Sequence, residues 1–343
     1  MQTKLLAVKT ARKEDEGIMA AAELLKAGGL VAIPTETVYG LAANALDGRA
    51  VRRIFAAKGR PQDNPLIVHI AKRETLESLV TRVPPSAVTL ADRFWPGPLT
   101  MILPKAACIP DEVSAGLDTV AVRFPSHPVA RAIIDASGFP LAAPSANTSG
   151  RPSPTRAEHV LHDLDGRIDA VVDGGACGVG VESTVVSLAG GCPRLLRPGG
   201  ITYEQLQAAV GPVEMDPAVT HALAKNAVAA SPGMKYQHYS PKARVVILKG
   251  SGEDYIRYVN DHKQEGTVAL CFDEDAASLQ VPAVPFGSQT DAEEQAQRLF
   301  DALRRIDGMG ASLAFARCPD QTGVGLAVFN RLIRAAAFEV VEL

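Results

Sequence analysis

The sequence predicts an α/β protein with two domains. Its 343 residues exceed the size at which a single hydrophobic core usually stops growing, about 250–300 residues. Short β-branched runs alternate with helical patterns over residues 1–210, at irregular spacing. Residues 243–343 repeat a regular strand–helix order, which is typical of a small doubly wound sheet.

The first domain is predicted to span residues 1–210. Its first helix, at 14–27, has acidic residues in its first turn and stops at Gly28-Gly29. Strands are predicted at 30–35, 65–70, 99–104, 119–124, 170–173 and 183–188. Further helices are predicted at 51–58, 127–137, 155–164 and 203–210. The strand spacing does not fit a simple βαβ repeat.

Residues 211–242 differ from both flanks, because small residues and prolines dominate and apolar periodicity fades. A loop of this length is expected to be a linker or functional. Proline and glycine punctuate both sides of an aromatic-rich turn, which suits a flap over an active site. The residues of that turn are Met234, Tyr236, His238 and Tyr239.

The second domain, 243–343, reads β-α-β-α-β-α-β. It carries GVGLAV at 323–328, which is not the GxGxxG pattern, so no dinucleotide is assigned to it.

Charge does not indicate a nucleic-acid binder. The net charge is −3, and residues 1–210 hold 22 basic and 21 acidic side chains. The distribution is uneven, however, since residues 47–73 contain seven Lys or Arg and two acids. This local excess can attract a polyanion, either a nucleoside triphosphate or RNA.

The cysteines and the apolar runs exclude other classes. Five cysteines are scattered without a CxxC pair, so neither a zinc cage nor a disulfide framework is expected. No apolar run reaches about 18 residues, and the N-terminus lacks the apolar core of a signal peptide. We expect a cytoplasmic protein with no membrane contact.

The common nucleotide and hydrolase motifs are missing. The chain has no GxxxxGK[ST], HExxH or GxSxG pattern. If the protein binds ATP, a less common phosphate cradle must do so. Lys58 and Arg60, at a predicted helix exit, are candidates, because a guanidinium fork and a compact ammonium both suit phosphate oxygens. Compensation of the helix dipole would give the same pattern.

Other polar segments stand beside predicted strands. His69 shares a strand face with Pro65 and Ile67. Its side chain could contact a ligand or be a buried core residue. PTETVYG (34–40) follows a strand with hydroxyls and ends in glycine, where α/β sheets often place ligands. APSANTSGRPSPT (143–155) combines stiff prolines with hydroxyls and amides that can bond an anion or adenine.

Taken together and in this order, these segments resemble one family. PTETVYGL, KxRPxxxPLIVH, WPGPLT, GLDTVAVRFP, PSAN, SGxPSPT, ESTVV and RPG are similar to the YrdC-like family, the L-threonylcarbamoyladenylate synthases. The resemblance covers about residues 14–210 and implies a YrdC-like twisted mixed sheet. The SPGMKYQHYSP linker and the tail resemble the long form of the same enzymes, with a smaller Rossmann-like domain.

The resemblance implies a nucleotidyltransferase. Such an enzyme joins L-threonine, bicarbonate and ATP into threonylcarbamoyl-AMP and releases pyrophosphate. A downstream transferase then modifies tRNA, and weak contact of the chain with tRNA is possible by the same resemblance. Mg²⁺ is expected with ATP, held through its phosphates and not by protein side chains.

The family also implies roles for individual residues. The triphosphate-facing, catalytic set comprises Lys58, Arg60, Ser145 and Asn147. The residues expected to contact ATP are Arg60, Asn64, Thr119, Ser145, Ser153, Arg197 and Tyr239. Those expected to shape the threonine pocket are Thr37, His69, Arg123, Ala143 and Ser183, with Arg123 as a partner for the carboxylate.

Two alternatives stay open. One is a module that binds double-stranded RNA without catalysis, which the basic stretch permits but the near-neutral first domain and few aromatic residues (5%) disfavour. The other is a carbamoyl transferase that works from carbamoyl phosphate on a similar cradle. The domain does occur in such proteins, but no zinc-finger cysteine spacing accompanies it in this sequence.

Overall fold

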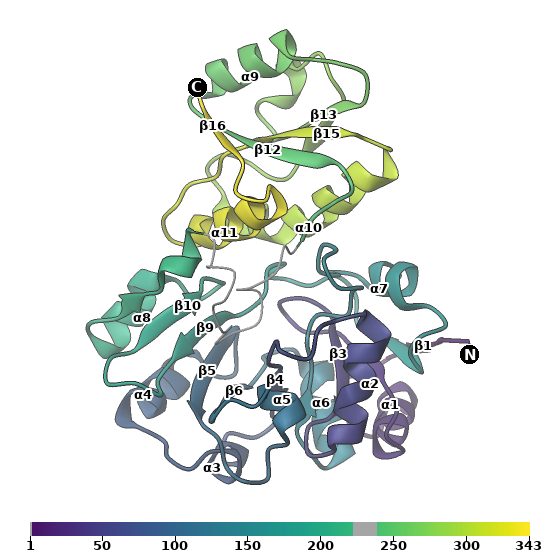
Figure 1. Cartoon of the computed structure of the whole chain (residues 1–343). Coiled ribbons are helices and arrows are strands. Elements are labelled where there is room, and N and C mark those ends of the chain that lie inside the picture. Colours follow the sequence, from purple (N-terminus) through teal and green to yellow (C-terminus); the bar gives the residue numbers. More distant parts are fainter. Residues whose placement is uncertain (1, 222–238) are drawn as a thin grey trace.

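The computed structural model describes residues 2–221 and 239–343 and contains two sheets (Figure 1). The larger sheet has eleven strands in the order β1-β8-β2-β3-β7-β4-β6-β5-β9-β10-β11. These are β1 (Lys4–Ala7), β2 (Val31–Ile33), β3 (Gly40–Asn44), β4 (Ile67–His69), β5 (Leu99–Pro104), β6 (Thr119–Arg123), β7 (Leu141–Ala142), β8 (Ala170–Asp173), β9 (Thr184–Ser187), β10 (Arg194–Arg197) and β11 (Glu214–Met215). The sheet is mixed, since β2, β4 and β9 each have one parallel and one antiparallel neighbour.

Helices cover both faces of this sheet. They are α1 (Glu16–Lys26), α2 (Gly48–Lys58), α3 (Thr75–Leu79), α4 (Pro85–Phe94), α5 (Asp111–Ser114), α6 (Pro128–Ser137), α7 (Ala157–Leu164) and α8 (Tyr203–Val210). Alternation along β2 separates two cores: Ala32 packs with α2 residues, while Val31 and Ile33 pack with α1 and α6. The expected mixed-sheet α/β fold is confirmed.

Local capping explains why α2 ends between Lys58 and Arg60. Asp47 caps its start by accepting a hydrogen bond from the Arg49 amide at 2.9 Å. Gly59 ends it with φ of 61°, a left-handed conformation that costs glycine little. Lys58 and Arg60 therefore leave the helix on either side of a fixed bend.

The second sheet is five-stranded and parallel throughout, in the order β14-β13-β15-β12-β16. Its strands are β12 (Arg244–Lys249), β13 (Thr267–Cys271), β14 (Ala283–Pro285), β15 (Leu313–Arg317) and β16 (Val340–Glu342). Its helices are α9 (Gly252–Asp261), α10 (Ala292–Gly308) and α11 (Gly325–Ala335). In Figure 1, α10 and α11 lie between this sheet and the larger one, and α9 covers the far face. The small parallel α/β unit is confirmed.

Several elements escaped the sequence analysis. The strands β1, β3, β10, β11 and β14 (Ala283–Pro285 in the second sheet), and the helices α3, α4 and α5, were not predicted. The larger sheet also extends past Val210, because β11 pairs with β10. Ser231, Pro232 and Gly233, together with Met234, Tyr236 and His238 of the proposed flap, lie outside the described residues. No described helix is long and apolar enough to span a bilayer.

The layers of the two sheets make both apolar and close polar contacts, since Val38 and Val181 belong to the hydrophobic core of the second sheet. Arg304 of α10 pairs with Asp163 of α7 at 2.8 Å. Asn330 of α11 donates to the Val219 carbonyl at 2.6 Å. Gly180 packs directly on α10, where an added Cβ would lie 2.3 Å from the Gln297 Cα. Only glycine fits there, since its φ of 80° also disfavours a side chain.

We predict that Gly180→Ala forces these layers apart. Backbone overlap and strain should lower the free energy of unfolding by about 1–3 kcal/mol and increase susceptibility to proteases. Thermal unfolding and limited proteolysis measure both effects. Gly178→Ala is the matched control, because a Cβ there meets no atom within 4 Å. Equal behaviour of the two variants would show that the Gly180 contact does not hold the layers together.

Candidate active site

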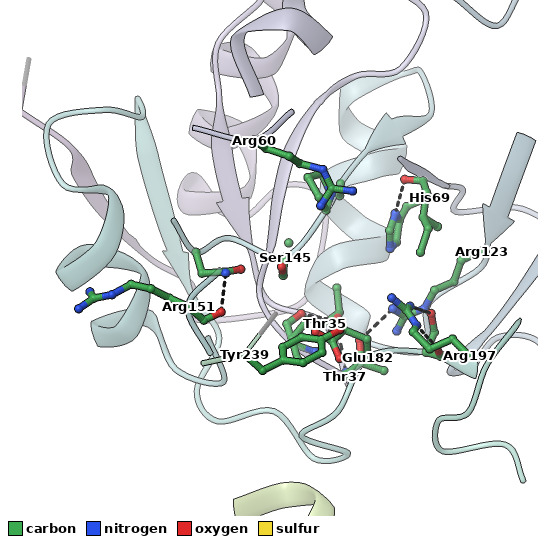
Figure 2. Close-up of a pocket in the computed structure, with 17 residues that line it drawn as sticks. Thr35, Thr37, Arg60, His69, Arg123, Ser145, Arg151, Glu182, Arg197 and Tyr239 are labelled. Carbon is green, nitrogen blue, oxygen red and sulfur yellow. Dashed lines mark hydrogen bonds between the residues drawn. The ribbon is translucent and has the colours of Figure 1, made fainter. Parts of the chain in front are cut away.

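A pocket with about 630 Å³ of empty space lies across the middle of the larger sheet (Figure 2). Strand ends and the segments that follow them supply most of its wall. The lining residues are Thr35, Thr37, Val38, Gly40, Arg60, Ile67, His69, Arg123, Ala143, Pro144, Ser145, Asn147, Arg151, Glu182, Ser183, Arg197 and Tyr239.

The segment after β2 folds into a hydroxyl-bonded turn. The Thr35 hydroxyl donates to the Val38 carbonyl at 2.6 Å and lies 2.9 Å from the Thr37 hydroxyl. Arg123 Nη1 donates to Thr37 Oγ1 at 2.8 Å. This local turn fixes Thr37 so that its hydroxyl reaches the pocket and a strand arginine at once.

Arg123 is buried in the wall and paired with a carboxylate that the sequence analysis did not single out. Its Nη2 lies 2.7 Å from Glu36 Oε1, and both side chains are largely buried. Burial alone would raise the pKa of Glu36, but the Arg123 charge outweighs it and lowers the pKa. Glu36 is therefore ionised, and Arg123 is a compensated cation on the pocket wall.

His69 is buried beside Arg123, which is its register partner on β6. Its Nδ1 lies 3.2 Å from the Ile67 carbonyl, which can only accept, so Nδ1 carries the proton. Burial, followed by repulsion from Arg123, lowers the pKa of His69 to about 3. At neutral pH the imidazole is uncharged, and Nε2 is left as an acceptor.

The two cations of the α2 exit have different positions. Arg60 lines the pocket and donates to the Asn64 and Pro65 carbonyls at 3.3 and 3.2 Å. Lys58 is 1% exposed and donates to the carbonyls of Ser145 and Asn147. Burial, followed by the nearby Arg60 charge, lowers the pKa of Lys58 well below its usual value. Lys58 thus supports the Ser145–Asn147 turn from beneath and does not line the pocket.

Ser183 and Arg197 form a second polar part of the wall. Arg197 donates from Nε to the Ser183 carbonyl at 3.0 Å and from Nη2 to its hydroxyl at 3.1 Å. The Ser183 hydroxyl also lies 2.8 Å from that of Thr100. Burial, followed by repulsion from Arg331, lowers the pKa of Arg197 to about 10, so it stays charged at neutral pH.

Most of the predicted site residues converge on this one pocket. Those on its wall are Thr37, Arg60, His69, Arg123, Ala143, Ser145, Asn147, Ser183, Arg197 and Tyr239. Lys58, Asn64, Thr119 and Ser153 are not on the wall. Ser153 is fully buried and donates to Glu182 Oε1 at 2.5 Å. Asn64 is 1% exposed, and neither of its amide atoms has a hydrogen-bond partner among the described residues.

Sequence reasoning missed other wall residues. They are Thr35, Val38, Gly40, Ile67, Pro144, Arg151 and Glu182. Most lie inside the quoted motifs, so the motif itself was the available signal. Glu182 and Glu36 gave no separate signal. A carboxylate is recognised as a counter-ion only when its cationic partner in the fold is known.

The chemistry that this wall offers is electrostatic. Arg60, Arg123, Arg151 and Arg197 surround a space that hydroxyls and a neutral histidine also reach. No group of three or more His, Cys, Asp or Glu side chains in the described part of the chain could hold a metal ion. Such a wall can bind an anion together with a small polar molecule and stabilise charge that develops between them.

Comparisons with known proteins agree with this arrangement. A family model described as "Telomere recombination" matches residues 23–199. A second, described as "Threonylcarbamoyl-AMP synthase, C-terminal domain", matches residues 201–337. Together the two matches cover both sheets except for the edge strands β1 and β16.

Individual relatives are similar over nearly the whole chain. A threonylcarbamoyl-AMP synthase of Bacillus subtilis is 50% identical over 335 residues, which cover 96% of this chain and 95% of the relative. One from Pyrococcus abyssi is 46% identical, with 97% of each chain covered. The crystal structure of P. abyssi Sua5 with L-threonine matches 99% of this chain and 100% of its own, at 44% identity and a TM-score of 0.91.

We predict that His69 contributes to acid sensitivity. The unfolded chain binds a proton below pH 6.5 that the folded chain accepts only near pH 3, so stability falls as the pH drops through this window. His69→Gln should weaken this dependence, measured as the free energy of unfolding against pH. The exposed His262, replaced by Gln, is the control. An unchanged slope in His69→Gln would contradict the buried neutral imidazole.

Proposed function

The chain belongs to the threonylcarbamoyl-AMP synthase family, a family of nucleotidyltransferases, and from this premise we propose that its pocket joins L-threonine, bicarbonate and ATP. One observation supports the proposal above others. The wall combines a compensated arginine and a neutral histidine on one side with Arg60 and the Ser145–Asn147 turn on the other. These are separate environments for an amino acid and for phosphates.

The threonine would lie against β4 and β6. Arg123 would bind its carboxylate, since Glu36 already balances part of the arginine's charge and the amino acid completes the pair. His69 Nε2 would accept a hydrogen bond from its amino or hydroxyl group. Thr37, Ala143 and Ser183 would shape the remaining space. The P. abyssi relative crystallised with L-threonine supports this substrate.

ATP would occupy the other side. Arg60, Ser145 and Asn147 would face the triphosphate, and the buried Lys58 would act through the turn that it supports. Asn64, Thr119, Ser153, Arg197 and Tyr239 are proposed to contact the rest of the nucleotide. The unpartnered buried amide of Asn64 favours this role, because such a group is costly unless a ligand satisfies it.

Mg²⁺ would enter with ATP and add positive charge at its phosphates. The described residues offer hydroxyl and amide groups near that position but no carboxylate cluster, which fits an ion held by the phosphates.

The proposed reaction has two steps. The threonine amine forms a bond to the bicarbonate carbon, and water leaves to give a carbamate. A carbamate oxygen then bonds to the α-phosphorus while the bond to the bridging oxygen breaks, and pyrophosphate leaves with the electron pair. The protein needs no covalent nucleophile, since fixed cations and donors stabilise the developing charge.

The product is a labile mixed anhydride, so a downstream transferase that modifies tRNA is the proposed consumer. Direct contact with tRNA and the cytoplasmic location stay predictions from the sequence. The RNA-binding module and the carbamoyl transferase predict different reactions, which allows a direct test.

The test is pyrophosphate release with substrates omitted in turn. We expect release only when L-threonine, bicarbonate and ATP are all present, with threonylcarbamoyl-AMP as the second product by mass spectrometry. A carbamoyl transferase would instead require carbamoyl phosphate, and an RNA-binding module would release nothing. Either of these outcomes contradicts the proposal.

We further predict that Arg60→Ala lowers kcat for pyrophosphate release by about a hundredfold, or about 3 kcal/mol, with the fold retained. The reason is the loss of a fixed cation beside the leaving group. Arg49→Ala is the control, because Arg49 lies on the same helix with its side chain 87% exposed. Near-wild-type turnover in Arg60→Ala would move the triphosphate site elsewhere.

A further inference from the structure

Arg331, on α11 of the second sheet's layer, reaches the wall of the pocket in the larger sheet. Its side chain is fully buried. Nε donates to Glu182 Oε2 at 2.8 Å, Nη2 to the Glu182 carbonyl at 3.1 Å, and Nη1 to the Pro198 carbonyl at 2.9 Å. The two residues that it contacts are sequence neighbours of wall residues, since Glu182 precedes Ser183 and Pro198 follows Arg197. One distant arginine thus fixes two pieces of the wall.

Glu182 connects this arginine to a third piece. The carboxylate lines the pocket, and its second oxygen accepts the Ser153 hydroxyl at 2.5 Å. The charged and titratable groups that face it are Arg331, Arg197, Lys58 and Tyr239. Burial would raise the pKa of Glu182, but Arg331 and then Arg197 outweigh burial and lower it. Glu182 is therefore a buried anion at neutral pH.

A buried anion on this wall opposes the binding of ATP unless a cation cancels it. The effect differs between the two substrates, because ATP is a polyanion and threonine is a zwitterion with no net charge. Arg331 cancels the Glu182 charge from outside the larger sheet. The Tyr239 ring packs against Arg331, whose guanidinium carbon lies 5.9 Å from the ring centroid. The Arg331–Glu182 pair is therefore placed to affect the binding of ATP more than that of threonine.

We propose that Arg331 is a positioning residue for ATP: it neutralises Glu182, and through that carboxylate it fixes Ser153 and the 182–198 wall. This inference rests on the proposed ATP site. It assigns the second domain a direct electrostatic part in nucleotide binding, although no side chain of its sheet or helices lines the pocket within the described residues.

The test uses the full chain and compares how each variant changes the KM for ATP. Arg331→Met leaves Glu182 uncompensated and should raise the KM for ATP by about tenfold, with little change in the KM for threonine. Glu182→Gln removes the anion while its amide oxygen can still accept the Ser153 hydroxyl, so the KM for ATP should rise by no more than about threefold, less than in Arg331→Met. The double variant should restore ATP affinity relative to Arg331→Met.

Arg334→Met is the matched control. Arg334 is another buried arginine of α11, which donates to the Ala218 carbonyl at 2.7 Å, so its loss disturbs the same interface without uncovering Glu182. Calorimetric titration with ATP repeats the comparison without turnover, and the thermal unfolding of each variant is recorded. Equal losses in Arg331→Met and Glu182→Gln, or a double variant worse than both, would overturn the proposal.

Should Arg331→Met not fold, Arg331→Lys and Glu182→Gln carry the test. The lysine keeps the charge and should bind ATP within about threefold of wild type, and the glutamine should lose no more ATP affinity than that. A lysine variant that loses about tenfold or more in ATP affinity, with an equal loss for threonine, would overturn the inference. A wild-type chain without three-substrate pyrophosphate release would instead refute the proposed function, which separates the two failures.

Discussion

Buried arginines can stand around this pocket because buried carboxylates compensate them. Arg123 lies against Glu36 on the wall, and Arg331 lies against Glu182 behind it. Removing one member of such a pair leaves a charge that neither water nor protein satisfies, at a cost of several kcal/mol. The wall is therefore rigid where it is charged. A site with cations already positioned needs little reorganisation when phosphate charge develops in it.

This constraint also explains what the sequence could and could not reveal. Strands 99–104 and 170–173 were predicted at their observed bounds, since β-branched runs between turn signals are local features. The face assignment of His69 with Ile67 was likewise correct, because both side chains reach the pocket. The two-residue β7 lacks enough sequence for any periodicity, and its position is set by its neighbours β3 and β4.

The charge partners lay beyond sequence reasoning for a different reason. Glu36 and Arg123 are 87 positions apart, and Glu182 and Arg331 are 149 apart. Nothing local marks either carboxylate as a counter-ion. Local sequence also could not reveal the surroundings of Lys58. Its motif predicted a phosphate contact, and in the fold its buried ammonium donates to the carbonyls of Ser145 and Asn147. The quoted motifs supply much of the pocket wall, and only the three-dimensional structure shows which of their residues line it.

We propose that one pocket holds threonine and ATP on opposite sides. A crystal structure with L-threonine and a non-hydrolysable ATP analogue tests this arrangement. We expect the threonine carboxylate on Arg123, its polar groups near His69 Nε2, and the phosphates against Arg60, Ser145 and Asn147. Phosphates bound outside this pocket, for example at the strand ends of the second sheet, would contradict it.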